Sequence, residues 1–118
     1  MTQTSYTILM MLTATPAWLG QSRKERATFR TTVIQPVLER YANHVQVRFY
    51  DAEAFAARCS DFAIFTTEDL QTYTFLIEAL RDTALFTVPY FVVNEVLIGL
   101  ENGYQAFEEA SSVQRQSS

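Results

Sequence analysis

One segment near the start of the chain, SYTILMMLTA at residues 5–14, constrains the fold more than any other. Its residues alternate as those of a β-strand do, and both alternating sets are apolar. One set is Tyr6, Ile8, Met10 and Leu12, and the other is Leu9 and Met11. A strand with two apolar faces is typical of a central strand that is covered on both sides. The segment therefore predicts a sheet with this strand in its interior.

A loop is predicted at residues 15–21, and a long helix follows it. Ser22 and Glu25 have the spacing of a capping box, which marks a helix start. The helix then carries one apolar stripe at helical spacing. The stripe consists of Phe29, Val33, Ile34, Val37, Leu38 and Tyr41. Pro36 lies inside it and is expected to kink the helix or divide it, because proline removes a backbone hydrogen bond.

The rest of the chain is predicted to contain three more strands and a second long helix. Residues 45–50 alternate as a half-buried strand, residues 51–58 either extend it or form a turn, and residues 60–66 form a third strand. Thr66 and Asp69 suggest a second capping box before a helix whose stripe is Leu70, Tyr73, Leu76, Ile77 and Leu80. A fourth strand is predicted at 87–96, with Pro89 near its start, and a short terminal helix at 99–109.

The order βαββαβ followed by a helix predicts a ferredoxin-like α+β fold, with an antiparallel sheet and the helices on one face. We expect a single domain over residues 1–110 and a flexible polar tail at 111–118. The open face of the sheet would be apolar, so it needs a partner. A second copy of the sheet is the simplest one, which makes a homodimer the expected state.

Charge and cysteine content exclude several classes of function. The formal net charge is −4 and the isoelectric point about 4.9, which argues against nucleic acid and against anionic membranes as partners. The basic residues Arg23, Lys24, Arg26 and Arg30 are expected to form a solvated helix face. Cys59 is the single cysteine, which fits a reducing compartment, the cytoplasm. The apolar run at residues 8–12 is too short to span a membrane, and no basic residue precedes Arg23 as a signal peptide would require.

Arg48, Tyr50 and Asp61 are the candidate catalytic residues. Arg48 and Tyr50 lie on the strand face opposite Val47 and Phe49, so they would point to the open face of the sheet. Asp61 is an acid at the start of an apolar strand. It is either paired with an arginine, such as Arg48, or a candidate general base. A structural Arg–Asp pair is the alternative to a catalytic role, and Arg58 and Arg81 are other possible partners.

Trp18, Tyr90 and Arg81 are the candidate ligand-binding residues. Trp18 would either stack on a ligand or close the core as an apolar lid. Tyr90 and Asn94 would share one strand face and line the same cavity, and Arg81 borders the stripe of the second helix. His44, the only histidine, is expected to cap a helix end rather than to bind haem, and the sequence predicts no cofactor and no metal site.

Four segments together resemble one known family: TATPAWL at 13–19, FYDAEAF at 49–55, CSDF at 59–62 and FLIEALRDTALFTVPYFVV at 75–93. They resemble the darcynin family of bacterial proteins, over roughly residues 5–107. The resemblance implies the dimeric α/β-barrel superfamily at the level of fold. That group includes cofactor-free monooxygenases, muconolactone isomerases, haem-binding chlorite dismutases and stress-response proteins, so the fold alone does not define a function.

Two hypotheses of function follow. In the first, the protein binds a small apolar or aromatic molecule or acts on one without a cofactor, and the surplus of nine Phe and six Tyr residues serves a pocket. In the second, it is a non-enzymatic homodimer with a structural or interaction role, and the aromatic residues serve the interface.

Overall fold

The computed structural model describes residues 4–117. The strands are β1 (Tyr6–Ala14), β2 (Val45–Asp51), β3 (Asp61–Thr67) and β4 (Phe91–Leu100). The helices are α1 (Pro16–Leu19), α2 (Arg23–Phe29), the π-helical segment η1 (Arg30–Ile34), α3 (Gln35–Arg40), α4 (Leu70–Arg81), α5 (Ala84–Thr87) and α6 (Gly103–Ser117). The chain forms the ferredoxin-like α+β fold that the order of elements predicts.

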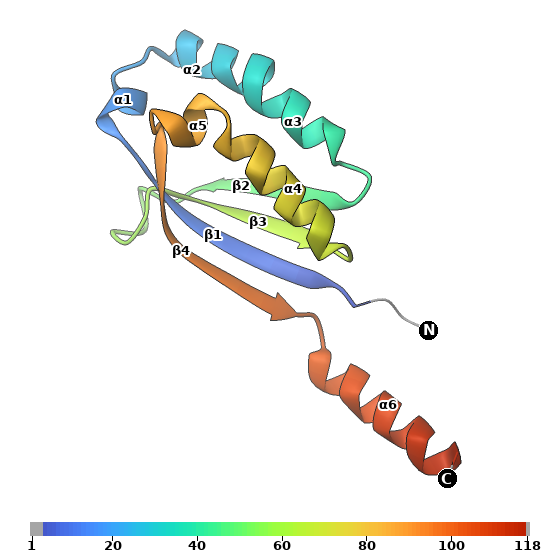
Figure 1. Cartoon of the computed structure of the whole chain (residues 1–118). Helices are drawn as coiled ribbons and strands as arrows, with labels where there is room; N and C mark the ends of the chain where they lie inside the picture. Colours follow the sequence, from blue (N-terminus) through green and yellow to red (C-terminus); the bar gives the residue numbers. More distant parts are fainter. Residues whose placement is uncertain (1–3, 118) are drawn as a thin grey trace.

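The four strands form one antiparallel sheet in the order β2-β3-β1-β4, so β1 is an interior strand as its sequence predicts. The helices α2, α3 and α4 lie over one face of this sheet, and its other face has no described helix over it (Figure 1). Alternation decides which residues meet the helices. Ile8, Met10 and Leu12 of β1 are buried beneath them, while Leu9 and Met11 point to the open face.

The hydrophobic core lies between the helices and the sheet. Its most buried large side chains are Phe65, Ile8 and Leu76. The apolar stripes predicted for the two long helical regions all belong to this core or pack against it. The periodicity therefore identifies the buried helix faces correctly.

The first helical region begins with the predicted capping box. The Ser22 backbone N–H donates to Glu25 Oε1 at 2.9 Å, and the Glu25 N–H donates to Ser22 Oγ at 3.1 Å. The region is divided as expected, because the π-helical segment η1 ends directly before Gln35 and Pro36, which begin α3. Proline cannot donate the backbone bond of a regular helix, and its ring crowds the carbonyl four residues earlier, so a wider turn precedes it.

Two short helices replace segments that the sequence analysis describes otherwise. The predicted loop 15–21 contains α1, whose first turn is capped by the Thr15 hydroxyl. The predicted fourth strand 87–96 is wrong at both ends, because α5 occupies Ala84–Thr87 and β4 runs from Phe91 to Leu100. The Thr83 hydroxyl accepts from the Leu85 N–H and caps α5. In both places a threonine cap stabilises a single turn that has no helical periodicity to reveal it.

The cap of α4 is Asp69, not the predicted box of Thr66 and Asp69. The Asp69 carboxylate accepts from the Thr72 N–H at 3.1 Å and from the Thr72 hydroxyl at 2.6 Å. Thr67 supports this turn, since its hydroxyl accepts from the Asp69 N–H and donates to the His44 carbonyl. Thr66 instead belongs to β3.

We therefore expect Asp69→Ala to lower the melting temperature by a few degrees and Thr66→Ala to lower it less, as measured by circular dichroism. The hydrogen bonds from Thr72, first from its hydroxyl and then from its N–H, hold the pKa of Asp69 below its ordinary value. The stabilisation by this carboxylate is thus complete at neutral pH and is lost as the pH falls through the lowered pKa. The stability difference between wild type and Asp69→Asn should shrink below about pH 4. A larger loss for Thr66→Ala would contradict this assignment.

Helix α6 is longer than predicted and leaves the body of the domain (Figure 1). It begins at Gly103, four residues after the predicted start, and continues to Ser117 through most of the segment predicted as a polar tail. The radius of gyration is 17.8 Å, against about 13.5 Å expected for a compact chain of this length. The projecting helix accounts for the difference. Within residues 4–117, no helix combines the length and apolar character needed to cross a membrane.

Candidate functional site

A cavity of about 160 Å³ lies between the sheet and the helices, where α1 and α5 close one end of the core. It is lined by Leu12, Trp18, Phe29, Arg30, Ile34, Phe49, Asp61, Leu85 and Phe91. Each of the four strands contributes one lining residue near the same end of the sheet. Leu12 and Phe49 lie near the ends of β1 and β2, and Asp61 and Phe91 begin β3 and β4. The cavity therefore arises from the convergence of strand ends that are distant in sequence.

Trp18 forms an aromatic wall of the cavity together with the residues that precede and begin β4. Its ring centroid lies 5.3 Å from those of Tyr90 and Phe91 and 5.8 Å from that of Phe29. Only 6 % of Trp18 is exposed, so the indole closes the core and lines the cavity at once.

Hydrogen bonds hold this wall in place. The Thr15 N–H donates to the Tyr90 carbonyl at 2.9 Å, and the Thr15 hydroxyl donates to the Pro89 carbonyl at 2.7 Å. The Gln21 side-chain amide donates to the Tyr90 hydroxyl at 2.8 Å. Tyr90 precedes β4 and packs behind Trp18, so it does not share a strand face with Asn94 as the sequence suggests.

The cavity has two polar members, Arg30 from η1 and Asp61 from β3. Asp61 pairs with Leu12 across the β1–β3 ladder, which turns its side chain toward the helices. Its carboxylate accepts from the Ser60 hydroxyl at 2.7 Å. Among the described residues Arg30 and Asp61 form no ion pair with each other. One cation and one anion thus border a largely apolar space without neutralising each other directly.

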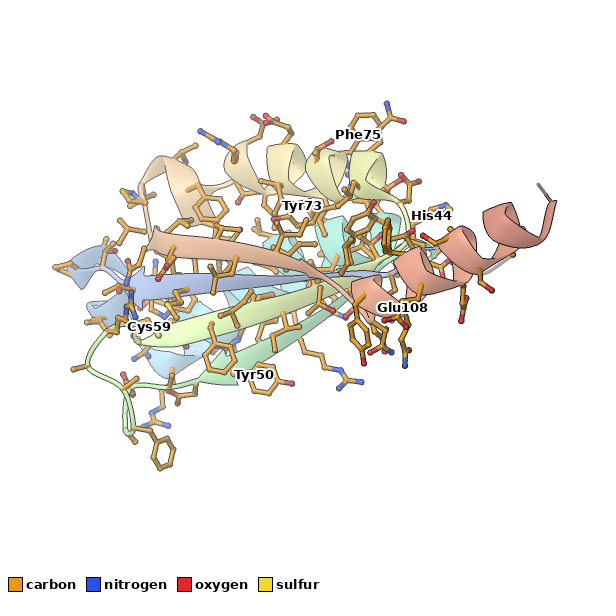
Figure 2. The ribbon with its side chains drawn as sticks, turned by 90° about the horizontal axis from the view of Figure 1, so that it is seen from below. His44, Tyr50, Cys59, Tyr73, Phe75 and Glu108 are labelled. Atoms are coloured by element: carbon orange, nitrogen blue, oxygen red, sulfur yellow. The ribbon has the colours of Figure 1, made fainter. Side chains whose placement is uncertain are left out.

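The predicted group of Arg48, Tyr50 and Asp61 is divided between the two faces of the sheet. Tyr50 pairs with Phe62, and Arg48 pairs with Ile64, on the open face, as expected for both. The Tyr50 ring stacks on that of Phe62 at 4.8 Å, and Figure 2 shows Tyr50 on β2 in a view from the side of this face. Asp61 lies on the opposite, helix-covered face, so the structure does not bring it together with Arg48.

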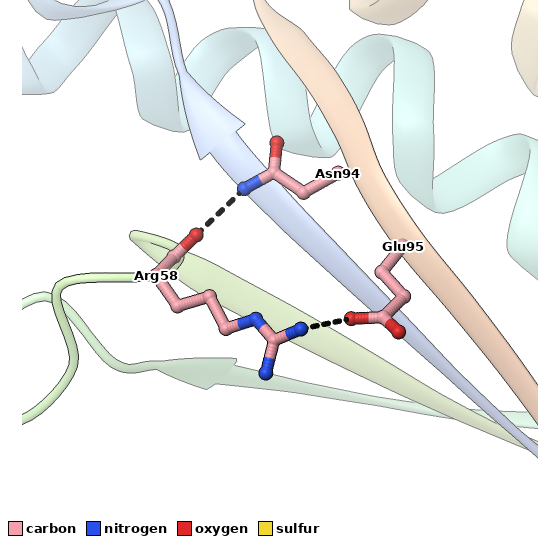
Figure 3. A network of polar contacts seen from close by, with 3 residues as sticks. All are labelled: Arg58, Asn94 and Glu95. Atoms are coloured by element: carbon pink, nitrogen blue, oxygen red, sulfur yellow. Dashed lines mark hydrogen bonds and ion pairs between the residues drawn. The ribbon is translucent and has the colours of Figure 1, made fainter.

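The alternative arginine partners of Asp61 also lie elsewhere. Arg58 forms an ion pair with Glu95 at 3.1 Å, and its carbonyl accepts from the Asn94 side chain at 2.9 Å (Figure 3). These contacts join the loop between β2 and β3, the predicted turn, to β4. Arg81 lines a separate apolar groove between α4 and β4, together with Tyr73 and Ile77, the residues that share its helical stripe.

Sequence reasoning missed four important members of the cavity: Arg30, Phe49, Leu85 and Phe91. Arg30 was expected to be part of a solvated face, and it is indeed exposed at the rim. The alternation of β2 places Phe49 correctly on the helix side. Nothing in the local pattern shows that a space remains beside it, because that space depends on how α1 and α5 close the end of the core.

Solved structures with a similar fold are chains more than twice as long. A point variant of chlorite dismutase from Candidatus Nitrospira defluvii matches with a TM-score of 0.70 and 13 % identity, over 83 % of this chain and 40 % of that one. A structure described as a novel haem-binding protein from Thermus thermophilus matches with a TM-score of 0.66 and 13 % identity, over 84 % and 40 %. This chain spans about two fifths of each, and the likeness establishes the fold alone.

The residues of the cavity do not fit haem. Its volume of about 160 Å³ is below the roughly 300–1,000 Å³ of pockets that enclose drug-sized ligands. Haem iron is held by His, Cys, Met or Tyr, and none of these lines the cavity. His44 and Cys59 lie toward opposite ends of the sheet (Figure 2). Among residues 4–117, no three His, Cys, Asp or Glu side chains are grouped to hold a metal ion.

Proteins that are similar in sequence identify the family of this chain more specifically than those that share only its fold. The family model described as "Darcynin, domain of unknown function" matches residues 2–114. Darcynin 1 of Acinetobacter baumannii is 44 % identical over 90 residues, which cover 76 % of this chain and 99 % of that protein. This confirms the resemblance seen in the four sequence segments. The chain belongs to the darcynin family.

Proposed function

We propose that this protein binds a small molecule, about the size of one aromatic ring, in the cavity between the helices and the sheet. The observation that carries the proposal is a mainly apolar space, open on one side at Phe49 and Arg30, whose lining includes one cation and one carboxylate that do not pair with each other among the described residues. A well-formed apolar pocket with a few convergent polar groups is the usual form of a small-molecule site.

The size of the cavity selects the size of the ligand. Its volume of about 160 Å³ is close to that of an engineered protein cavity of about 150 Å³ that binds benzene. The rings of Trp18, Phe29, Phe49 and Phe91 offer edges and faces to a planar ligand. A single substituted ring therefore fits without rearrangement of the core.

The polar groups select the substituents of that ring. Asp61 can accept a hydrogen bond or a proton from a ligand hydroxyl, and Arg30 can meet an acceptor or an anionic group. Phenols and hydroxylated aromatic acids combine these features. If the protein is an enzyme, Asp61 is the cavity residue that can act as a general base.

The proposal is tested by titrating the ¹⁵N-labelled protein with phenol and with benzene and following backbone amide shifts by NMR. We expect saturable shifts around Leu12, Phe49 and Leu85, with dissociation constants of about 0.1–1 mM for ligands this small. Asp61→Asn should weaken phenol binding about tenfold, because a charge-assisted hydrogen bond is lost, and should leave benzene binding unchanged.

A matched pair of substitutions locates the binding. Leu85→Phe adds volume inside the cavity and should weaken both probes at least tenfold. Leu19→Phe makes the same change at a side chain that is 56 % exposed and should have no effect. Equal binding by the two variants, or shifts that do not saturate, would refute the proposal.

A second candidate function is that of a structural homodimer, and the open face of the sheet favours it. This face carries the stacked pair Tyr50 and Phe62, with Leu9, Met11, Ile64 and Leu97 around it. Leu97 is 52 % exposed and Tyr50 is 38 % exposed in the single chain. Two such faces packed together would bury these side chains, as in oligomers with two-fold symmetry. The dimer and the ligand site use opposite faces of the sheet and are compatible.

A further inference from the structure

The hydrophobic core of the domain does not cover the helix-side residues of its edge strand β4. Val93, Val96, Ile98 and Leu100 of β4 pair with residues of β1 that face the helices. Their neighbours Leu12, Met10 and Ile8 are at most 7 % exposed, whereas these four β4 residues are between 43 % and 57 % exposed. No described helix of the domain covers this part of the sheet (Figure 1).

The first part of this strip, at Val93 and Val96, borders a groove of about 570 Å³ between α4 and β4. Tyr73, Ile77 and Arg81 form one wall, and Phe91, Val93 and Val96 form the other and the floor. Long, exposed, apolar edge strands promote aggregation unless something covers them. A helix packed beside α4 would complete the layer over the sheet.

Helix α6 also leaves apolar surface uncovered, because it is amphipathic and projects away from the body of the domain (Figure 1). Tyr104 is 66 % exposed and Phe107 is 73 % exposed. By helical spacing, Ala106, Phe107 and Ala110 share one side, and Gln105, Glu109 and Ser112 share the other. The small alanines beside Phe107 allow this side to approach another surface closely.

We propose that α6 of one copy lies in the groove between α4 and β4 of a second copy, and that the exchange is reciprocal. The inference rests on the proposed homodimer and names a second contact within it. A symmetric exchange covers both grooves and both helices with one kind of contact.

The link between β4 and α6 favours exchange over folding back within one chain. The link consists of Glu101 and Asn102. The Glu101 N–H donates to the Ser5 carbonyl at 3.0 Å, and the Asn102 carbonyl accepts from the Gln105 and Ala106 N–H groups. Asn102 has a φ of 52°, a left-handed conformation that asparagine tolerates well. These contacts direct α6 away from its own groove.

The length of α6 also matches the strand that it would cover. A helix of 15 residues is about 22 Å long, and a strand of ten residues is about 33 Å long, so α6 can cover two thirds of β4. Arg81 is exposed at the groove, while the part of α6 with described side chains carries Glu108 and Glu109 as its charged residues. Both glutamates lie on the polar side of α6 by helical spacing, so its apolar side can enter the groove without burying a charge.

Cross-linking tests the exchange in the full chain, in a Cys59→Ala background. Chains carrying Phe107→Cys are mixed with size-tagged chains carrying Val96→Cys and treated with a short bismaleimide. We expect a covalent heterodimer on a denaturing gel. The control mixture of Ser112→Cys with Val96→Cys should give at least tenfold less product, because Ser112 lies on the polar side of α6.

Chains that carry both Phe107→Cys and Val96→Cys distinguish exchange from folding back. Exchange predicts covalent dimers, and folding back predicts a cross-linked monomer, which would overturn the inference. Sedimentation equilibrium of the unmodified protein separates the remaining outcomes. A dimer without the Phe107–Val96 cross-link would overturn the arm exchange and leave the homodimer standing, whereas a monomer at high micromolar concentration would overturn both.

Discussion

Trp18→Ala is expected to lower the free energy of unfolding by about 3–5 kcal/mol, the range for removal of a buried tryptophan side chain. The indole is 6 % exposed and contacts the rings of Phe29, Tyr90 and Phe91. Its removal would merge an empty volume with the existing cavity, and the surrounding hydrogen-bonded turn cannot collapse to fill it. Urea unfolding followed by far-UV circular dichroism measures the loss.

The adjacent residue provides the control for this experiment. Leu19 belongs to the same short helix and is 56 % exposed, so Leu19→Ala should cost less than about 1 kcal/mol. Added indole should restore part of the stability of Trp18→Ala, since a ligand that binds the folded state alone stabilises it. Equal losses for the two variants, or no rescue by indole, would show that the aromatic wall does not enclose a cavity.

Leu76→Ala is the second substitution with a large expected effect, about 2–5 kcal/mol. Leu76 is fully buried in α4, at the centre of the core cluster. Its neighbour Phe75 is larger but 50 % exposed, and it points away from the sheet (Figure 2). Phe75→Ala should therefore cost much less, although it removes more atoms.

Thermal and urea unfolding of the two α4 variants would compare burial with size directly. A greater loss for Phe75→Ala would mean that α4 presents a different face to the sheet, or that a partner covers Phe75. In that case the loss should depend on protein concentration, because the stability of an associated protein does.

Local patterns determined much of the architecture. The two apolar faces of residues 5–14 predicted the interior position of β1, and the stripes around Phe29 and Leu76 predicted which helix faces are buried. The alternation of β2 also placed Arg48 and Tyr50 on the open face. These properties depend on residues two to four positions apart, so the sequence displays them directly.

The same reasoning failed where the sequence pattern did not show which face of a strand is buried. Both faces of β3 are apolar, with Ala63 and Phe65 on one and Phe62 and Ile64 on the other. Alternation therefore could not show that Asp61 lies on the helix-covered face of the sheet, opposite to the open face that carries Arg48. The short helices α1 and α5 were missed for a related reason, since one turn held by a threonine cap is shorter than the helical repeat.

The sequence by itself thus determined the order of the elements, the interior strand and the buried faces of the long helices. Only the tertiary structure decided that Arg30 and Asp61 share a cavity with four aromatic rings, because that space forms where four strand ends meet two short helices. It also decided that β4 and α6 are left uncovered. Periodicity shows that a residue is apolar on a given face, but whether another element reaches that face depends on the packing of the whole chain.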